Sequence, residues 1–290
     1  MTVAQEITKV EYNLRAGKYG GQLILPSDWC LASVANKLID LPSEADLVTE
    51  TQYQQLPIGS QLRKNGKFYR YSKAGEAMAA SHRGFLKCNK IRCPGLAGNS
   101  VGEGYEAAMA AATVAGATSF VISDTAAAKN EYENAYAVWY DDTNNLYDDA
   151  IVIGNDASNG TTTTLYIAPP GLKGAHAAAV QVTVYRNPYI SVGSLLTAGN
   201  QNWKSALGYA KFAITSGYFF WLQTAGQISG VTGASTWPGQ TAYQRDVYAN
   251  TDGSLIGITA TTYLYQRVGH LLAGTSAAYG DNFIMLELDR

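Results

Sequence analysis

Four aspartates in the middle of the chain are the residues whose type and spacing are best suited to chemistry, namely the binding of a metal ion. They are Asp141, Asp142, Asp148 and Asp149, and two asparagines between them add amide oxygens. Calcium takes several oxygen ligands of these kinds, so a calcium site is one interpretation. The cluster lacks the mid-loop glycine and the closing glutamate of an EF-hand loop. We favour a hairpin turn, in which Asp and Asn accept unusual backbone angles, and we expect no metal or other cofactor.

Catalytic chemistry has little support in the sequence. The three histidines, His82, His176 and His270, lie far apart, and none is beside a recognisable nucleophile motif. The Gly-x-Ser-x-Gly elbow, the phosphate-binding loop and the His-Glu-x-x-His zinc motif are all absent. We therefore interpret the histidines as structural and predict a protein without catalytic residues, not an enzyme.

The three cysteines, Cys30, Cys88 and Cys93, are also interpreted as structural or incidental. An odd number of cysteines in a chain without an evident secretory signal argues against a disulfide framework. Cys88 and Cys93 have the spacing of half a zinc site, but a second pair of ligands is missing.

Residues 217–226 contain a run of large apolar and aromatic side chains. Five such residues in succession, 218–222, predict a strand that is covered on both faces, by the core on one side and by another sheet or chain on the other. An aromatic platform for sugar binding is the alternative. Because glycan-binding aromatics usually stand apart on an exposed face, we favour the core strand.

Short strands separated by polar turns are the elements that must position these groups. They are expected at residues 67–72, 119–123, 135–140, 150–153, 162–167, 180–185, 217–224, 261–265 and 283–288. Their regular spacing predicts a mainly β protein with an antiparallel β-sandwich or barrel-like body. The alanine-rich residues 105–117 favour a short helix by propensity, or a loop that leads into the next strand.

Residues 1–65 differ from this body and predict an extended N-terminal arm. Residues 29–41 place apolar side chains on one face at helical spacing, with Ser27 or Asp28 as a candidate cap, so we expect one short helix there. An arm of this kind commonly lies against a neighbouring chain. We therefore divide the chain into the arm (1–65), a β-rich domain (66–190) and a C-terminal β-rich region (191–290).

The composition indicates contact with other proteins and argues against other partners. Charged residues are 15% of the chain, against about 25% in soluble domains. The net charge is −2 and no Lys/Arg run occurs, which argues against nucleic acid. No apolar window of about 18 residues is present, so we expect no membrane association. The 20 Tyr and 5 Trp suit either protein interfaces or strands. Our candidate interface residues are Tyr19, Trp29, Tyr69, Tyr71, Phe219 and Trp221.

Four segments of the chain resemble structural proteins of tailed bacteriophages. They are residues 68–77, 114–121, 136–153 and 208–226, and together they cover residues 66–290 loosely. The resemblance implies a capsid decoration (cement) protein, a homotrimer or other symmetric oligomer that binds across subunits of the major capsid protein. It also implies a location on the capsid surface of the virion, after assembly in the host cytoplasm, and it implies no catalytic residues.

Two other functions stay open at this point. A tail or baseplate component, or the major capsid protein itself, belongs to the same class, although a major capsid protein usually has a long spine helix. A component that binds a host-surface glycan is the second possibility. It predicts exposed aromatics beside Asp or Asn, for example Trp237 with Asp246, or Tyr147 with Asp148.

Overall fold

The computed structural model describes residues 22–24, 41–78, 85–89, 105–194, 205–230, 238–239, 244–250, 252–257, 266–274 and 282–289. Within these ranges the protein is built from antiparallel β-sheets, which confirms the mainly β class, and its one helical segment is the 3-10 turn η2 (Asp46–Val48). None of the helical structure in the described part has the length or apolar character that a membrane crossing requires. The helix predicted at residues 29–41 lies, apart from Leu41, outside the described residues.

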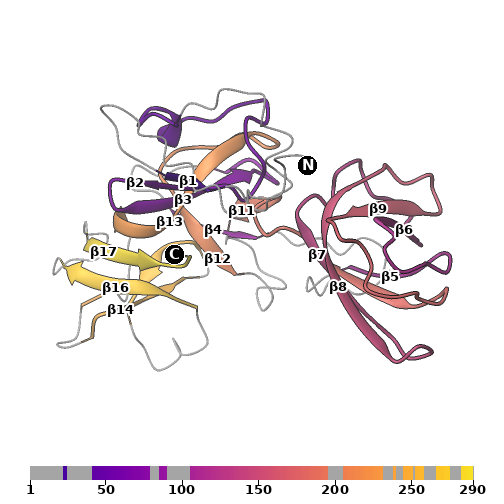
Figure 1. Cartoon of the computed structure of the whole chain (residues 1–290). Helices are drawn as coiled ribbons and strands as arrows, with labels where there is room; N and C mark the ends of the chain where they lie inside the picture. Colours follow the sequence, from indigo (N-terminus) through magenta and orange to yellow (C-terminus); the bar gives the residue numbers. More distant parts are fainter. Residues whose placement is uncertain are drawn as a thin grey trace, which may run out of the picture. The chain divides into compact units, whose positions relative to one another are not determined.

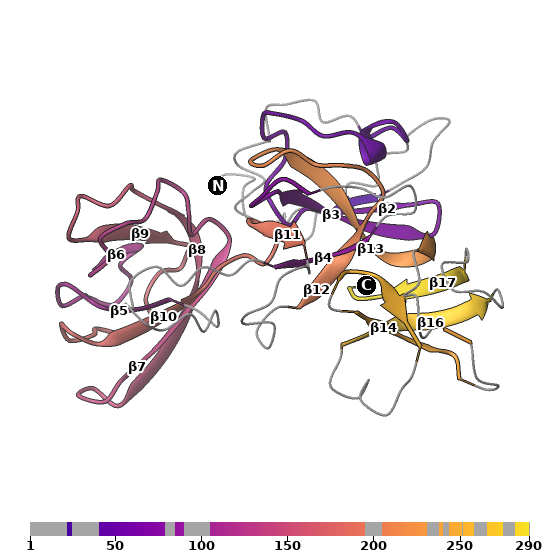
Figure 2. The same ribbon diagram turned by 180° about the vertical axis from the view of Figure 1, so that it is seen from behind.

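The chain divides into two compact units, and the second is inserted into the first. Unit 1 contains residues 1–90 and 188–290, and unit 2 contains residues 91–187 (Figures 1 and 2). The insertion lies between β4 (Phe85–Asn89) and β11 (Val192–Ser194), which pair with each other so that Asn89 is opposite Val192. The two connections to unit 2 therefore start from neighbouring points of one sheet.

The boundary expected near residue 65 falls inside unit 1. Asn65 and Gly66 form the turn between β2 (Gln61–Lys64) and β3 (Lys67–Lys73), with φ of 52° and 74°. Asn-Gly with both φ values positive is the favoured two-residue turn of a β-hairpin. The pairing of β2 with β3 thus joins the residues on either side of residue 65 in one sheet. The second expected boundary, near residue 190, lies close to residue 188, where the chain re-enters unit 1.

Unit 1 is organised around one long strand, β13 (Phe219–Gly230), in an eleven-stranded sheet. β13 is long enough to pair with β3 along its first part and with β17 (Asn282–Glu287) along its last part, and it also contacts β12 (Ala206–Ala210). The remaining strands of the sheet are β1 (Gln22–Ile24), β14 (Asp246–Ala249), β15 (Leu255–Ile256) and β16 (Arg267–Ala273).

The first eight residues of β13 are all buried, which confirms the prediction of a strand covered on both faces. Alternate side chains enter two different clusters. Phe219 and Trp221 pack with Tyr71 on one face, with ring centroids 5.9 and 5.2 Å from that of Tyr71. Phe220 and Leu222 pack on the other face. The continuous aromatic run therefore reflects a strand between two apolar layers.

Unit 2 is a six-stranded antiparallel sheet in the order β5-β10-β7-β8-β9-β6. Its strands are β5 (Tyr105–Ala108), β6 (Ser119–Ile122), β7 (Ala135–Asp141), β8 (Leu146–Asn155), β9 (Thr163–Ile167) and β10 (Gln181–Tyr185). β6, at one edge of this order, also contacts the chain just after β5, at the other edge. Met109 forms an isolated β-bridge with Ile122, and the Ala110 amide donates to the Val121 carbonyl at 2.8 Å. The sheet is thus nearly closed into a barrel, as the barrel-like prediction proposed.

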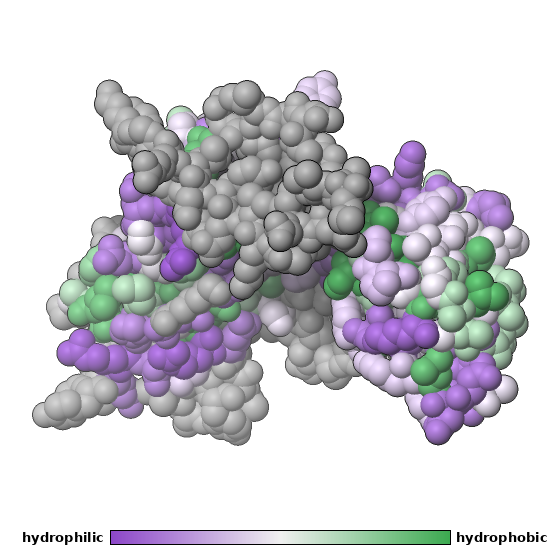
Figure 3. Space-filling view, viewed as in Figure 1, coloured by the Kyte–Doolittle hydropathy of each residue, from purple (hydrophilic) through white to green (hydrophobic). Residues whose placement is uncertain are grey.

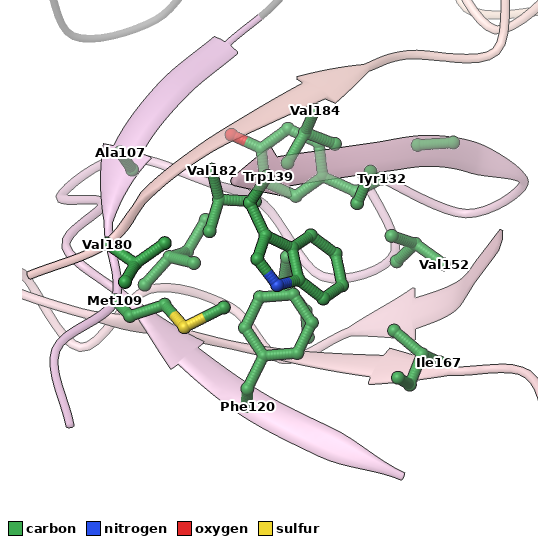
Figure 4. Packing of buried hydrophobic residues seen from close by; sticks show 14 of the residues in the cluster. Ala107, Met109, Phe120, Tyr132, Trp139, Val152, Ile167, Val180, Val182 and Val184 are labelled. Carbon is green, nitrogen blue, oxygen red and sulfur yellow. The ribbon is translucent and has the colours of Figure 1, made fainter. Parts of the chain in front are cut away.

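The interior of this barrel is filled by alternate residues of its strands (Figure 4). Phe120 and Trp139 meet with ring centroids 5.2 Å apart, and Val182 and Val184 are fully buried beside them. The helix option for residues 105–117 is wrong. Pairing of β5 with β10 and burial of Met109 in this core outweigh the small helix preference of the alanines.

Candidate functional site

The four central aspartates belong to the β7–β8 hairpin, as the turn interpretation predicted. Residues 142–145 form its turn, and Asp141 is paired with Leu146. The alternation of side chains along the two strands separates the acids. Asp141 and Asp148 point into the barrel and are buried, whereas Asp142 is exposed and Asp149 lies on the outer face.

Asp141 is surrounded by hydrogen-bond donors. Its carboxylate accepts hydrogen bonds from the amides of Thr143, Asn144 and Ala177 at 3.0, 3.2 and 2.8 Å, and from the Asn144 side-chain amide at 2.8 Å. These donors, the Ala177 amide first, lower the pKa of Asp141 to about 2. The lone pairs that a cation needs are therefore used by N–H groups.

His176 lies between the two buried aspartates. Its Nε2 is 3.1 Å from Asp148 Oδ2, and its Nδ1 is 3.5 Å from Asp141 Oδ2. The ring meets Trp139 edge-on with centroids 5.5 Å apart, and the Lys173 amide donates to Asp148 at 2.8 Å. Residues 173–177 are in this way fastened to the hairpin, so the arrangement acts as a structural tie. In the described ranges, no three or more His, Cys, Asp or Glu side chains gather as metal ligands would.

The other residues considered for chemistry are dispersed. His270 is beside Glu287, with 3.3 Å between Nδ1 and Oε1, and Cys88 is buried with its Sγ 3.2 Å from the Ser194 carbonyl oxygen. His82, Cys30, Cys93 and Trp237 lie outside the described residues.

Four of the six candidate interface residues are core residues of unit 1. Tyr69, Tyr71, Phe219 and Trp221 are between 2% and 8% exposed and pack in one cluster. Their aromatic character serves the fold of this chain, and they offer almost no surface to a partner. Tyr19 and Trp29 lie outside the described residues.

An exposed aromatic face instead lies on the outside of the barrel, over β10, β7 and β8. Nine outward side chains form three rows across these strands, and we call them the tyrosine face. They are Tyr140, Tyr147 and Gln181 in the first row, Val138, Asp149 and Thr183 in the second, and Tyr136, Ile151 and Tyr185 in the third. Cross-strand pairing sets Tyr140 opposite Tyr147, and Tyr136 opposite both Ile151 and Tyr185.

The tyrosine face has little net charge, and its hydroxyls have fixed partners. Tyr136 donates to Asp149 Oδ2 at 2.9 Å, and Tyr140 donates to Asn145. Lys173 pairs with Asp149 from the adjoining loop. The hydrogen bond to Asp149 raises the pKa of Tyr136 to about 12, and the Lys173 ammonium, followed by the Tyr136 hydroxyl, lowers the pKa of Asp149. Figure 3 shows the visible side of unit 2 as a mixture of pale, hydrophobic and hydrophilic residues.

Sequence reasoning named Tyr147 but gave it the wrong companion. Asp148 points into the barrel, and Tyr147 is opposite Tyr140, with Asp149 next along the strand on the same face. The signal was present in the two-residue alternation of Tyr136, Val138 and Tyr140. Recognising the face also required the register of three strands, and only the fold supplies that.

Comparison of the chain with protein-family models, with curated proteins and with solved structures found no match. We therefore infer its function from the two units and the tyrosine face.

Proposed function

We propose that this chain is a non-enzymatic structural protein of a tailed-bacteriophage particle that decorates the capsid. In this role it binds across subunits of the major capsid protein on the outer surface of the virion. It acts as a homotrimer or another symmetric oligomer, assembled in the host cytoplasm, and it stabilises the shell through contact area alone.

The observation that carries the proposal is the insertion of a nearly closed barrel between two paired strands of a larger sheet. The barrel has its own apolar core, so it is complete without help from unit 1. Its two connections leave from adjacent strands, β4 and β11. Unit 1 would bind the shell and carry unit 2 as a second module. Such an arrangement is suited to the surface of a particle.

Low charge supports the same role. With 15% charged residues, much of the surface is uncharged, as at the cores of protein interfaces. A standard interface buries roughly 1,600 Å² in total. Many symmetric copies would add such areas together over a shell.

Purified protein mixed with capsids stripped of accessory proteins tests the proposal. We expect light scattering to give a defined oligomer, co-sedimentation with the shells, and a higher temperature of shell disruption. Deletion of residues 1–20, the part of the predicted arm that precedes β1, is expected to weaken binding, and it leaves the core residues Leu47, Leu56 and Leu62 of unit 1 in place.

A second variant assigns the contact to unit 1. Replacement of residues 91–187 by a Gly/Ser linker of about four residues would close β4 and β11 into a hairpin. This variant is expected to bind shells as the full chain does. A full chain that neither sediments with shells nor raises their disruption temperature would refute the proposal.

Recognition of a host-surface glycan is a second candidate function, and the tyrosine face is the observation that favours it. It matches the expectation of exposed aromatics beside Asp or Asn, with Asp149 and Asn145 as the polar partners. The two functions are compatible, because unit 1 would bind the capsid and unit 2 would bind the glycan.

A further inference from the structure

We propose that the tyrosine face of the inserted barrel binds an uncharged carbohydrate chain, built from neutral hexoses. This inference rests on the second candidate function above and names its ligand class; it concerns unit 2 alone, so it stands or falls separately from attachment to a capsid.

The spacing of the tyrosines suits a ligand of several sugar rings. Tyr140 and Tyr147 form one aromatic pair, and Tyr136 and Tyr185 form a second pair four residues along β7. At about 3.4 Å per residue, the Cα atoms of Tyr136 and Tyr140 are roughly 14 Å apart along β7. Val138 and Thr183 lie between them, so a chain laid along β7 meets an aromatic pair at each end.

The side chains of the tyrosine face can contact both the C–H groups and the hydroxyl groups of a sugar. Tyrosine rings offer a rigid apolar surface to C–H groups at low entropic cost, with a polar tip for hydroxyls. The Tyr136 and Tyr140 hydroxyls donate to Asp149 and Asn145, and these hydrogen bonds hold both rings in place. The side chains are thus arranged before any ligand arrives, which lowers the cost of binding.

Charge selects the class of carbohydrate. Asp149 is the one ionisable carboxylate among the nine residues of the tyrosine face, and Lys173 neutralises it. The nine residues of the tyrosine face include no cation, so an anionic polysaccharide would bring carboxylates or sulfates against Asp149 with Lys173 already paired to it. A neutral chain meets no such repulsion.

The size of the face argues against a protein as its ligand. Three strands about 4.8 Å apart and four residues of length give a patch of roughly 14 by 10 Å. A stable protein interface needs about 800 Å² from each partner, several times this area. A ligand site with aromatic walls and a few fixed polar groups is the better match.

Affinity electrophoresis of the full chain tests the inference. Native gels are cast with dextran, mannan or galactan as neutral probes and with alginate as the acidic probe. We expect at least one neutral polysaccharide to retard the protein in a concentration-dependent way, and alginate to leave its mobility unchanged. Retardation by alginate alone, or by none of the four, would overturn the proposal.

The double variant Tyr140→Ala/Tyr147→Ala removes one aromatic pair. Each ring is expected to account for about a tenfold change in the dissociation constant. The matched control is Tyr166→Ala, because Tyr166 is 39% exposed on β9 and donates to Asp156 at 2.8 Å, yet lies outside the tyrosine face. Thermal melts check that both variants are folded.

Retardation that is equal in the double variant and the control would overturn the proposal. So would a double variant that loses binding to stripped capsids while polysaccharide gels never retard the parent chain, since the face would then be a protein contact. Loss of polysaccharide binding with shell binding intact, by contrast, is the result expected if both proposals hold.

Discussion

His176 Nε2 lies 3.1 Å from Asp148 Oδ2 inside the inserted barrel, where neither side chain reaches solvent. Asp141 faces the other ring nitrogen at 3.5 Å. The contacts join the loop at residues 173–177 to the β7–β8 hairpin, which also presents three of the four tyrosine-face aromatics. The buried contact between His176 and Asp148 thus stabilises the β7–β8 hairpin, on which the tyrosine face depends.

Replacement of Asp148 by alanine should destabilise the barrel by about 3 kcal/mol, because it leaves buried donors on His176 and Lys173 without an acceptor. Scanning calorimetry of the full chain measures the loss. The control is Asp142→Ala in the exposed turn of the same hairpin, expected to change stability by less than about 0.5 kcal/mol. Equal effects of the two substitutions would mean that the buried contacts contribute nothing.

The stability of the barrel should depend on pH in acid through Asp141. Its pKa is about 2 in the folded protein, against an ordinary 3.8. A depressed folded-state pKa stabilises the fold above the unfolded-state value, and that contribution is lost as the pH falls through the interval toward 2. The difference in melting temperature between the parent chain and Asp141→Asn should therefore be constant above about pH 5 and shrink toward pH 2. A difference that does not change with pH would contradict this assignment.

Tyr136 should ionise at an unusually high pH. The hydrogen bond to Asp149 raises its pKa to about 12, so Asp149→Asn is expected to bring the pKa back toward 10. NMR titration of ring-labelled tyrosine measures this directly. Tyr166, whose pKa is raised by its hydrogen bond to Asp156, serves as the internal reference, since the substitution leaves that pair intact. A Tyr136 pKa unaffected by the substitution would show that the pair does not form in solution.

Trp221→Ala should act on unit 1 alone. Trp221 packs against Tyr71 in the core beside β13, and removing so large a buried side chain typically costs about 3 to 5 kcal/mol. Because the units have separate cores, we expect two thermal transitions, of which only one moves. The matching change in unit 2 is Phe120→Ala, which should move the other transition. A common shift of both transitions would show that the units unfold together.

Local patterns in the sequence were sufficient for part of this structure. The burial of Phe219–Leu222 at the start of β13 follows from a run of aromatic and apolar side chains, because a strand covered on both faces can bury all of them. The β7–β8 turn follows from the Asp/Asn cluster, whose residues accept tight-turn angles. These features depend on residues close together in the chain.

The sequence by itself determined the β class, the doubly covered strand and the turn chemistry, since side-chain alternation and turn preference act over a few residues. The tertiary structure alone decided the insertion of the barrel, its closure from β6 back to the end of β5, and the inward direction of Asp141 and Asp148. It also decided that Tyr69 and Tyr71 are core residues while Tyr136 and Tyr140 are exposed. The physical reason is that strand register and burial are set by contacts between residues far apart in the chain, and a one-residue change of register would turn every side chain of a strand to the opposite face.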